Sequence, residues 1–236
     1  MPTTISFSPK SEVPDGRVEN LGDEPVRSTI GLMGIYSRLI FPRLCDWAMR
    51  NPRMVRLRLE ALSEVDGKIL EIGFGTGLNL EHYPDRVRRL TAVDPGVGMS
   101  RLARQRIERG RIDVDLRVQT AEELPFEDGR FDCVVSAWTL CSIRDAGRAI
   151  GEIGRVLKPG GRFLFLEHGL GDDPGVQRWQ HRLTPLQRRL ADGCSLDVDI
   201  EALIRRGAWH EVRVERFLLE GTPRIVGSMY RGVAVK

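Results

Sequence analysis

From about residue 68 onwards, stretches with the hydrophobic spacing of strands alternate with stretches with the hydrophobic spacing of helices. Short apolar runs or alternating apolar positions, typical of strands, recur and are separated by stretches with helical spacing. The strands expected from this pattern are Lys68–Ile72, Arg89–Val93, the run through Val114, Leu116 and Val118, Phe131–Ala137 and Gly161–Glu167. The helical spacing predicts helices over Met99–Arg109 and Asp145–Leu157, and a turn at "KPGG" is expected to close the second helix. Alternation of this kind favours a mostly parallel sheet with helices on both faces.

The two ends of the chain follow other patterns. Ser28–Ala61 has only helical spacing, and Val176–Leu190 and Val198–Arg206 predict two further helices. Residues 210–219 and 224–236 then predict two strands. Their connection is too short for a crossover, so they are expected to form an antiparallel hairpin. The pattern therefore predicts an α/β fold with a seven-stranded, mostly parallel sheet that ends in this hairpin.

The segment before residue 28 differs in composition from the rest. Residues 1–27 are rich in Pro, Ser, Gly and charged residues, which is typical of a flexible N-terminal arm or a mobile lid. Residues 28–236 are expected to form one domain, since a chain of 236 residues normally holds one or two.

Composition narrows the function classes. The formal net charge of +3 is too small to favour a nucleic-acid partner. The four cysteines have no CxxC spacing and no His at metal-ligand spacing, so neither a disulfide framework nor a metal site is expected. No apolar run reaches the length of about 18 residues that a membrane span needs, and the N-terminus lacks a signal pattern. We therefore expect a cytoplasmic protein. The cysteines are Cys45, Cys133, Cys141 and Cys194.

The most informative stretch is "KILEIGFGTGLNLEH", in which the first strand runs into glycines at alternate positions and then into helical spacing. A helix is therefore expected directly after the glycines. Glycines at such a turn let a ligand approach the backbone. The dinucleotide fingerprint would need a third glycine where this chain has Leu78, and no P-loop Lys follows. Glu71, just before the glycines, would repel a pyrophosphate but suits a ligand that carries positive charge. Asp94 ends the second strand, where an acidic residue accepts ribose hydroxyls. A ribose with a cationic end and no phosphate indicates S-adenosylmethionine.

These segments resemble class I S-adenosylmethionine-dependent methyltransferases. The resemblance is carried by "LEIGFGTG", "AVDPGVGM", "QTAEELPFEDGRFDCVVSAWTL" and "EIGRVLKPGGRFLFLEHG". It implies a Rossmann-like fold. Within the family, "GTGLNLEHYP", "WTLCSI", "LEHG", "LADGCSL" and "MYRGVAVK" are most similar to the thiol S-methyltransferase branch and to related ubiquinone- and phospholipid-type enzymes. The membrane-associated members of that branch have an apolar N-terminal anchor, and no such anchor is expected here.

The resemblance implies a set of cofactor contacts. Glycines of the loop and Glu71 would surround the methionine moiety, Asp94 would hold the ribose, and residues 121–122 would meet the adenine. Residues 137–139 would line the floor near the sulfonium. The full expected set is Glu71, Gly73, Gly75, Thr76, Gly77, Asn79, Asp94, Pro95, Met99, Ala121, Glu122, Ala137, Trp138 and Thr139, with Tyr36 in a possible lid.

Each of these roles has a structural alternative. Asp94 could cap the helix that follows it, Glu122 could cap a turn, and Trp138 could belong to the core. His168 follows the fifth strand on the ligand side of the sheet, where it could take a proton from an acceptor thiol or simply pack. Cys194 is interpreted as a packed thiol, since methyl transfer needs no enzyme nucleophile.

The expected function is methylation of a small molecule, with a thiol or hydrosulfide as the preferred acceptor. The alternatives are N-methylation of a phospholipid head group, methylation of a quinone precursor, and a non-catalytic cofactor-binding regulatory protein. The basic stretch 176–190 bears on the choice, because it could contact a membrane peripherally or form a solvated helix face over the pocket. The second interpretation is favoured.

Overall fold

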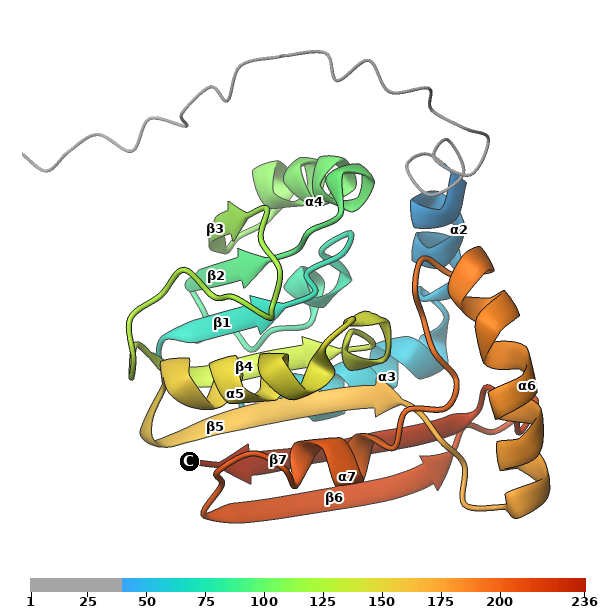
Figure 1. The fold of residues 1–236 in the computed structure, drawn as a ribbon. Coiled ribbons are helices and arrows are strands. Elements are labelled where there is room, and N and C mark those ends of the chain that lie inside the picture. The colour runs from blue at the N-terminus through green and yellow to red at the C-terminus, as the bar shows by residue number, and fades with distance from the viewer. Residues whose placement is uncertain (1–39) are drawn as a thin grey trace, which may run out of the picture. The chain divides into compact units, whose positions relative to one another are not determined.

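The computed structural model describes residues 40–236, apart from the side chains of residues 97–100. Its described part contains one sheet with the strand order β3-β2-β1-β4-β5-β7-β6 (Figure 1). The strands are β1 (Ile69–Ile72), β2 (Arg89–Val93), β3 (Asp113–Arg117), β4 (Phe131–Ala137), β5 (Leu157–His168), β6 (Glu211–Leu218) and β7 (Ser228–Val235). β1 to β5 pair in parallel, and β7 pairs antiparallel with both β5 and β6, so the expected mostly parallel sheet with a terminal hairpin is confirmed.

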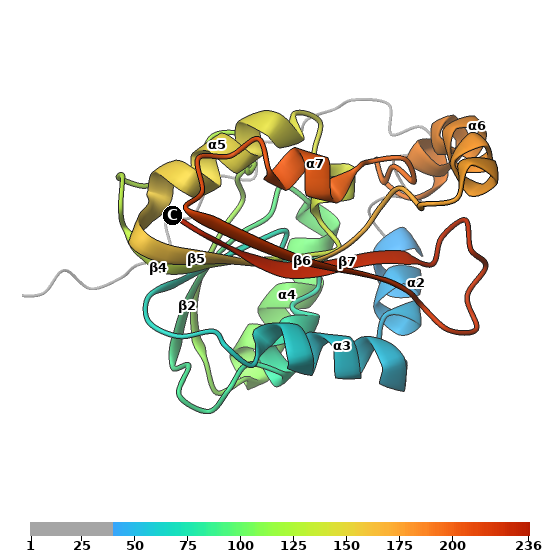
Figure 2. The ribbon, with the colours of Figure 1, turned by 90° about the horizontal axis from the view of Figure 1, so that it is seen from below.

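Helices cover both faces of the sheet. Figure 2 shows α5 and α7 on one face and α3 and α4 on the other. Each side has its own apolar core, one built around Leu70, Phe131 and Ile153, the other around Leu62, Ile69 and Ala103. The helices are α2 (Phe41–Ala48), α3 (Pro52–Leu62), α4 (Val97–Arg109), α5 (Ala146–Val156), α6 (Pro174–Leu190) and α7 (Ile200–Ile204), with the 3-10 turns η2 (Leu78–Glu81) and η3 (Leu140–Ser142).

Polar side chains fix where several helices begin. Asn51 accepts hydrogen bonds from the backbone N–H groups of Arg53 and Met54 at the start of α3. Asp145, Asp173 and Asp199 cap α5, α6 and α7 in the same way. Such caps satisfy donors that the first helical turn leaves unpaired. The observed helices therefore begin within a few residues of the predicted ones.

Three local predictions were wrong. The helix expected directly after the glycines is only the 3-10 turn η2, because Pro84 disfavours helical backbone in the residue before it. The "KPGG" segment, predicted as a turn, lies inside β5, where the pairing with β4 is irregular and Gly160 has φ +74°. The third strand ends at Arg117, and Val118 is exposed.

Some predictions fall outside the described residues. The arm proposed for residues 1–27, the boundary at residue 28, the first part of the helical region and Tyr36 all lie before residue 40. Within residues 40–236, no helix combines the length and apolar content that a membrane crossing requires.

Two helices lie at the edge of the sheet where the parallel strands end. Figure 1 shows α2 and α6 beside the carboxyl ends of β4 and β5. The fully buried Gln180 anchors α6, accepting from Gly171 N at 2.9 Å and donating to Gly169 O at 3.1 Å. Thr76 Oγ1 donates to Asp46 Oδ1 and so links the glycine loop to α2. Ligands bind at this edge in open α/β sheets.

Candidate functional site: a cofactor cleft at the carboxyl ends of the strands

The glycine loop leaves β1 in a conformation that favours glycine. Gly73, Gly75 and Gly77 have φ values of +68°, +58° and +77°. A Cβ on Gly73 would lie 2.0 Å from Thr139 Oγ1, which belongs to the loop after β4. The first glycine is therefore required so that these two loops can pack together, and it brings Thr139 to the end of β1.

Asp94 organises two of the predicted segments. Its Oδ2 accepts from Gly75 N at 2.8 Å and its Oδ1 accepts from Gly96 N at 2.7 Å. Burial raises the pKa of this carboxyl group, against the two backbone hydrogen bonds. An ionised carboxylate has about four lone-pair sites, so two hydrogen bonds leave room for ribose hydroxyls. Asp94 thus both shapes the loop and keeps the acceptors that a ribose needs.

Glu71 is the centre of a buried polar network rather than an open side chain. It is 1% exposed, Asn79 Nδ2 donates to its Oε1 at 2.7 Å, and Tyr83 Oη donates to its Oε2 at 2.7 Å. Burial raises the pKa of Glu71 to about 7, even though these hydrogen bonds and the charge of Arg58 favour the carboxylate. A cationic ligand nearby would offset that cost of ionisation.

Arg58 on α3 is a site residue that the sequence pattern did not reveal. It is 5% exposed, its Nε donates to Asn79 Oδ1 at 2.9 Å, and its Nη1 donates to Met49 O at 2.8 Å. Its guanidinium carbon lies 4.6 Å from the centroid of the Trp138 ring. Burial lowers the pKa of Arg58 to about 10, so it stays charged at neutral pH. Arg58 therefore contacts the Trp138 ring directly and reaches Glu71 through Asn79.

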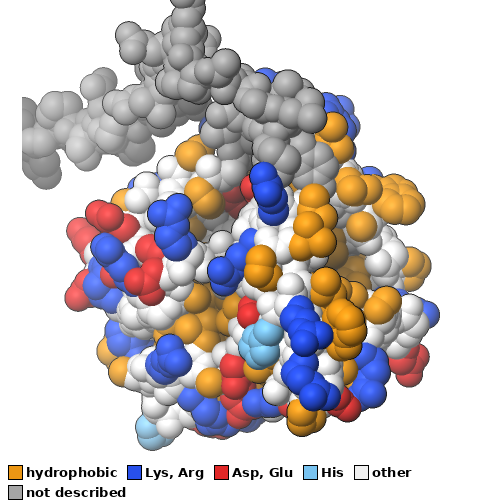
Figure 3. Space-filling model, turned by 45° about the vertical axis from the view of Figure 1, so that its right-hand side comes forward, with side chains coloured by type: hydrophobic (Ala, Val, Ile, Leu, Met, Phe, Trp, Pro, Cys, Tyr) orange, Lys and Arg blue, Asp and Glu red, His pale blue; other side chains and the backbone are white. Residues whose placement is uncertain are grey.

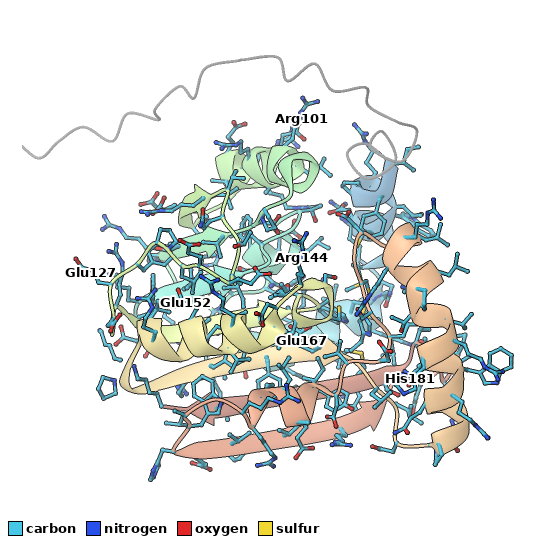
Figure 4. All side chains as sticks on the ribbon, viewed as in Figure 1. Arg101, Glu127, Arg144, Glu152, Glu167 and His181 are labelled. Atoms are coloured by element: carbon cyan, nitrogen blue, oxygen red, sulfur yellow. The ribbon has the colours of Figure 1, made fainter. Side chains whose placement is uncertain are left out.

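The loop after β4 carries backbone strain. Trp138 has φ +53°, in the left-handed region that large side chains rarely occupy. Glu167 supports this turn, since its Oε2 accepts from Thr139 N at 2.8 Å and from Leu140 N at 3.1 Å. Figure 4 shows Glu167 beneath this loop. Strain of this kind persists only where the surroundings enforce it, and it concentrates at functional sites.

Burial raises the pKa of Glu167 to about 7, against its hydrogen bonds to Ser136, Leu140 and Thr139. Glu167 is a residue that the hydrophobic pattern did not reveal, because it only marks the end of an apolar strand there. The residue signals its role by being acidic within "FLFLE".

Some of the remaining predicted residues lie at the carboxyl edge of the sheet, and the others lie in the apolar core or near the starts of α4 and α5. Thr76 is buried and Ala137 ends β4, so both lie at the carboxyl edge of the sheet. Ala121 belongs to the apolar core, and Glu122 Oε1 accepts from Asp145 N at 3.4 Å at the start of α5. This contact places Glu122 beside the start of α5, and its role at the adenine stays a prediction. The backbone of Met99 lies in α4, and Pro95 is exposed after β2.

His168 does not stand alone at the end of β5. Its Nε2 lies 3.0 Å from Cys194 Sγ, and Cys141 Sγ lies 3.8 Å from the same sulfur. Burial opposes the charged form of His168, but the Cys194 thiol and the charge of Glu167 outweigh it and raise its pKa. Cys194 is the packed thiol that the sequence analysis expected, although its neighbours were not foreseen.

The side chains gathered at this edge of the sheet fit S-adenosylmethionine in their charge and hydrogen-bonding capacity. Two buried carboxyl groups, Glu71 and Asp94, flank a loop of three glycines with positive φ. Burial of a carboxylate without a cationic partner is costly, and a sulfonium with an ammonium group supplies positive charge. When bound, the cofactor supplies a methyl group attached to a sulfonium sulfur.

Comparison with known proteins gives the same assignment. The family described as "Methyltransferase domain" matches residues 70–165. Human thiol S-methyltransferase TMT1A is 30% identical over 184 residues, which cover 75% of either chain. Phosphatidylethanolamine N-methyltransferase of Cereibacter sphaeroides is 30% identical over 166 residues, covering 70% of this chain and 77% of the relative.

A solved structure extends the likeness to the fold. Phospholethanolamine N-methyltransferase 2 of Haemonchus contortus, in complex with S-adenosylhomocysteine, superposes with a TM-score of 0.62 at 18% identity. The match covers 88% of this chain and 58% of that one. This likeness concerns the fold, and the relatives above show that the chain belongs to the S-adenosylmethionine-dependent methyltransferases, whose cofactor is S-adenosylmethionine.

Proposed function

We propose that the protein transfers a methyl group to the sulfur of a small thiol or of hydrosulfide. The observation that carries the proposal is the contact between His168 Nε2 and the Cys194 sulfur, 3.0 Å apart at the carboxyl end of β5. It supports the proposal because a sulfur atom already packs there beside a nitrogen that can accept a proton. The 30% identity to human thiol S-methyltransferase TMT1A supports the same acceptor class.

The proposed residues have separate tasks. The loop of Gly73–Gly77 and Asp94 would bind the cofactor, while Arg58, packed on Trp138, would fix the floor of the cleft. His168 would orient the acceptor sulfur and hold its proton as the new carbon–sulfur bond forms. Alignment and exclusion of water are the main requirements, since a thiol is already a few per cent thiolate at neutral pH.

A second candidate function is N-methylation of a phospholipid head group. Its support is the outer surface of α6, where Trp179, Leu186 and Leu190 are each at least half exposed. Arg182 lies over the Trp179 ring, 5.8 Å from its centroid. Figure 3, viewed toward α2 and α6, shows hydrophobic side chains interspersed with Lys and Arg. Exposed apolar groups beside arginines suit the interface of an anionic membrane.

The two functions are separated by one acceptor assay. The full chain receives S-adenosylmethionine with small thiols and hydrosulfide, or with phosphatidylethanolamine vesicles, and a phosphine reductant replaces thiol reductants. Mass spectrometry of a methyl thioether or a methanethiol product would support the proposal. Methylated lipid alone would establish the second function instead. Absence of product from every thiol, with cofactor binding confirmed by calorimetry, would contradict the proposed acceptor.

His168→Asn tests the role given to the imidazole. We expect a lower kcat on thiols with little change in the dissociation constant of the cofactor, because His168 is placed on the acceptor side. His181→Asn is the matched control, since His181 lies on α6 and pairs with Asp197. Equal turnover of His168→Asn and the unmodified chain would remove His168 from the mechanism.

A further inference from the structure

Three potential metal ligands converge beside the cofactor cleft. The ligand atoms of Cys141, His168 and Cys194 all lie within 4.8 Å of one another. They come from three elements: the turn η3, the end of β5 and the loop between α6 and α7. Their spacing along the chain predicted no metal site. The fold groups them because β4 and β5 are neighbours and the loop at Cys194 folds back over both strand ends.

The loop that carries Cys194 is fixed to η3. Ser195 N donates to Cys141 O at 2.9 Å, and Arg188 Nε donates to Ser195 Oγ at 2.7 Å. Gly193, with φ +91°, lets the chain turn sharply just before Cys194. These contacts fix the backbone of the Cys194 loop against the backbone of Cys141.

The separation of the two sulfurs agrees with the geometry of a tetrahedral thiolate site. Zinc–sulfur bonds of about 2.3 Å at tetrahedral angles place two sulfurs about 3.8 Å apart. The Cys141 and Cys194 sulfurs are 3.8 Å apart. A nitrogen ligand would lie about 3.6 Å from each sulfur, whereas His168 Nε2 lies 3.0 Å from Cys194 Sγ. A small rotation of the imidazole would open the space that an ion needs.

The surroundings provide further polar contacts. Gln187 Nε2 donates to Cys194 Sγ at 3.8 Å, and Ser142 Oγ lies 3.7 Å from Cys141 Sγ. Donors near a sulfur stabilise the thiolate that a metal requires, and such outer contacts commonly orient ligands. Two thiolates with one imidazole select thiophilic or borderline ions over Mg²⁺ or Ca²⁺.

We propose that Cys141, His168 and Cys194 form a binding site for Zn²⁺ with a fourth coordination position left open. Three protein ligands with one open position distinguish reactive zinc sites from closed structural ones. With the ion bound, His168 Nε2 would coordinate it and could not hold a proton, so the zinc site and the proton-holding role proposed above are alternatives for this residue. The site goes beyond the proposed function, since it requires neither a thiol acceptor nor a bound cofactor.

The test measures metal binding without cofactor or acceptor. The full chain is stripped with a chelator, kept reduced with a phosphine and titrated with Zn²⁺ against a chromophoric chelator. Substitution with Co²⁺ then reports the ligands through sulfur-to-cobalt charge-transfer absorption. We expect one equivalent of Zn²⁺ and the spectrum of a four-coordinate thiolate site.

Variants assign the ligands. Cys141→Ser, Cys194→Ser and His168→Asn should each weaken Zn²⁺ binding by more than about 100-fold, beyond the loss seen for outer contacts. Cys45→Ser and His181→Asn are the matched controls and should bind like the unmodified chain, with thermal unfolding confirming that all five fold. Failure of the reduced chain to bind Zn²⁺, or an equal loss in the controls, would overturn the site. A Cys141–Cys194 disulfide that forms when reductant is removed, in a chain that binds no Zn²⁺ when reduced, would also overturn it.

Discussion

At the scale of single residues, the central feature is a carboxyl group buried without a permanent counter-ion in direct contact. Among residues 40–236, the hydrogen-bond partners of Glu71 are the neutral groups of Asn79 and Tyr83, and Arg58 reaches it through Asn79. The unliganded protein therefore holds a group that ionises reluctantly, beside a loop expected to receive a cationic cofactor. Stability and cofactor affinity should depend on pH in opposite directions.

The first prediction concerns stability. The pKa of Glu71 is raised from 4.5 to about 7 in the folded state, so its contribution is most favourable below pH 4.5 and is lost as pH rises through 7. We expect Glu71 to lower the free energy of unfolding by up to about 3 kcal/mol over that window. Urea unfolding of the unliganded chain across pH would measure it. Glu71→Gln keeps the acceptor for Asn79 Nδ2, donates to Tyr83 Oη in place of accepting from it, and should flatten this part of the profile. An unchanged profile would contradict the assignment.

The second prediction concerns the cofactor. The ionised form of Glu71 attracts a sulfonium or ammonium group, so the affinity for S-adenosylmethionine should rise with pH up to about 7 and level off above it. Calorimetry in buffers with different ionisation enthalpies would detect the released proton. In Glu71→Gln, the part of the proton release that comes from Glu71 should disappear. Proton release that persists in that variant would point to another group.

Asp94 gives a third prediction. Asp94→Asn replaces one of the two oxygens that accept from Gly75 N and Gly96 N by a donor. We expect a loss of cofactor binding free energy of roughly 1.5–3 kcal/mol, the scale of hydrogen bonds to a charged group. Calorimetric titration measures the loss. Asp113→Asn, an exposed change on β3, is the control and should titrate like the unmodified chain.

Residues of the cleft were predictable to different degrees. Glu71, the glycines and Asp94 could be placed from the sequence because each follows directly from a strand end. Arg58 and Tyr83 could not, because their roles depend on how α3 and the segment after η2 pack against β1. Cys141, His168 and Cys194 likewise meet only through the tertiary fold.

At the scale of elements, α3 is tied to the floor of the cleft by Arg58. This leads to a fourth prediction. Arg58→Lys keeps the charge but loses the planar fork that reaches Asn79, Met49 and the Trp138 ring. We expect the free energy of unfolding to fall by roughly 1.5–3 kcal/mol. Arg56→Lys, on the exposed side of the same helix, should change it by less than about 0.5 kcal/mol. If urea unfolding gave the same loss of free energy for Arg58→Lys and Arg56→Lys, the structural role of Arg58 would be refuted.

The strand β7 gives a fifth prediction. A Cβ on Gly232 would lie 2.1 Å from Arg213 O and 2.6 Å from Phe165 Cζ, so this position between β5 and β6 has no space for a side chain. Gly232→Ala should lower the free energy of unfolding by about 1–3 kcal/mol. Gly151→Ala is the control, since nothing lies within 4 Å of its added Cβ in α5, and it should be neutral or stabilising. Thermal unfolding that ranks the two variants the other way would contradict the packing described.

The positions of helices and strands could be predicted from the sequence where a single sequence pattern applied. Alternation of strands and helices predicted the parallel sheet, and a short connection predicted the antiparallel hairpin. The rules conflicted at the glycine loop and at "KPGG". In the first, helical spacing was overridden by Pro84 and by the burial of Asn79. In the second, turn-forming residues were incorporated as an irregularity in a long strand.

At the scale of the whole described chain, the sheet order could not be derived from the hairpin alone. Sequence spacing indicated that the last two strands pair with each other, but it did not indicate which of them contacts β5. The structure places β7 between β5 and β6, with residues 162–168 paired to residues 229–235. β7, the last strand along the chain, therefore lies inside the sheet and not at its edge.

This order has a consequence for synthesis of the protein. β7 is translated after every other strand of the sheet, so β5 has one unpaired edge, and β6 has no partner, until residue 235 has left the ribosome. An unpaired apolar strand edge is a template for intermolecular association. The nascent chain should therefore depend on chaperone cover over β5 until β7 arrives, and ribosomes stalled between residues 218 and 228 should carry chains that cannot complete the sheet.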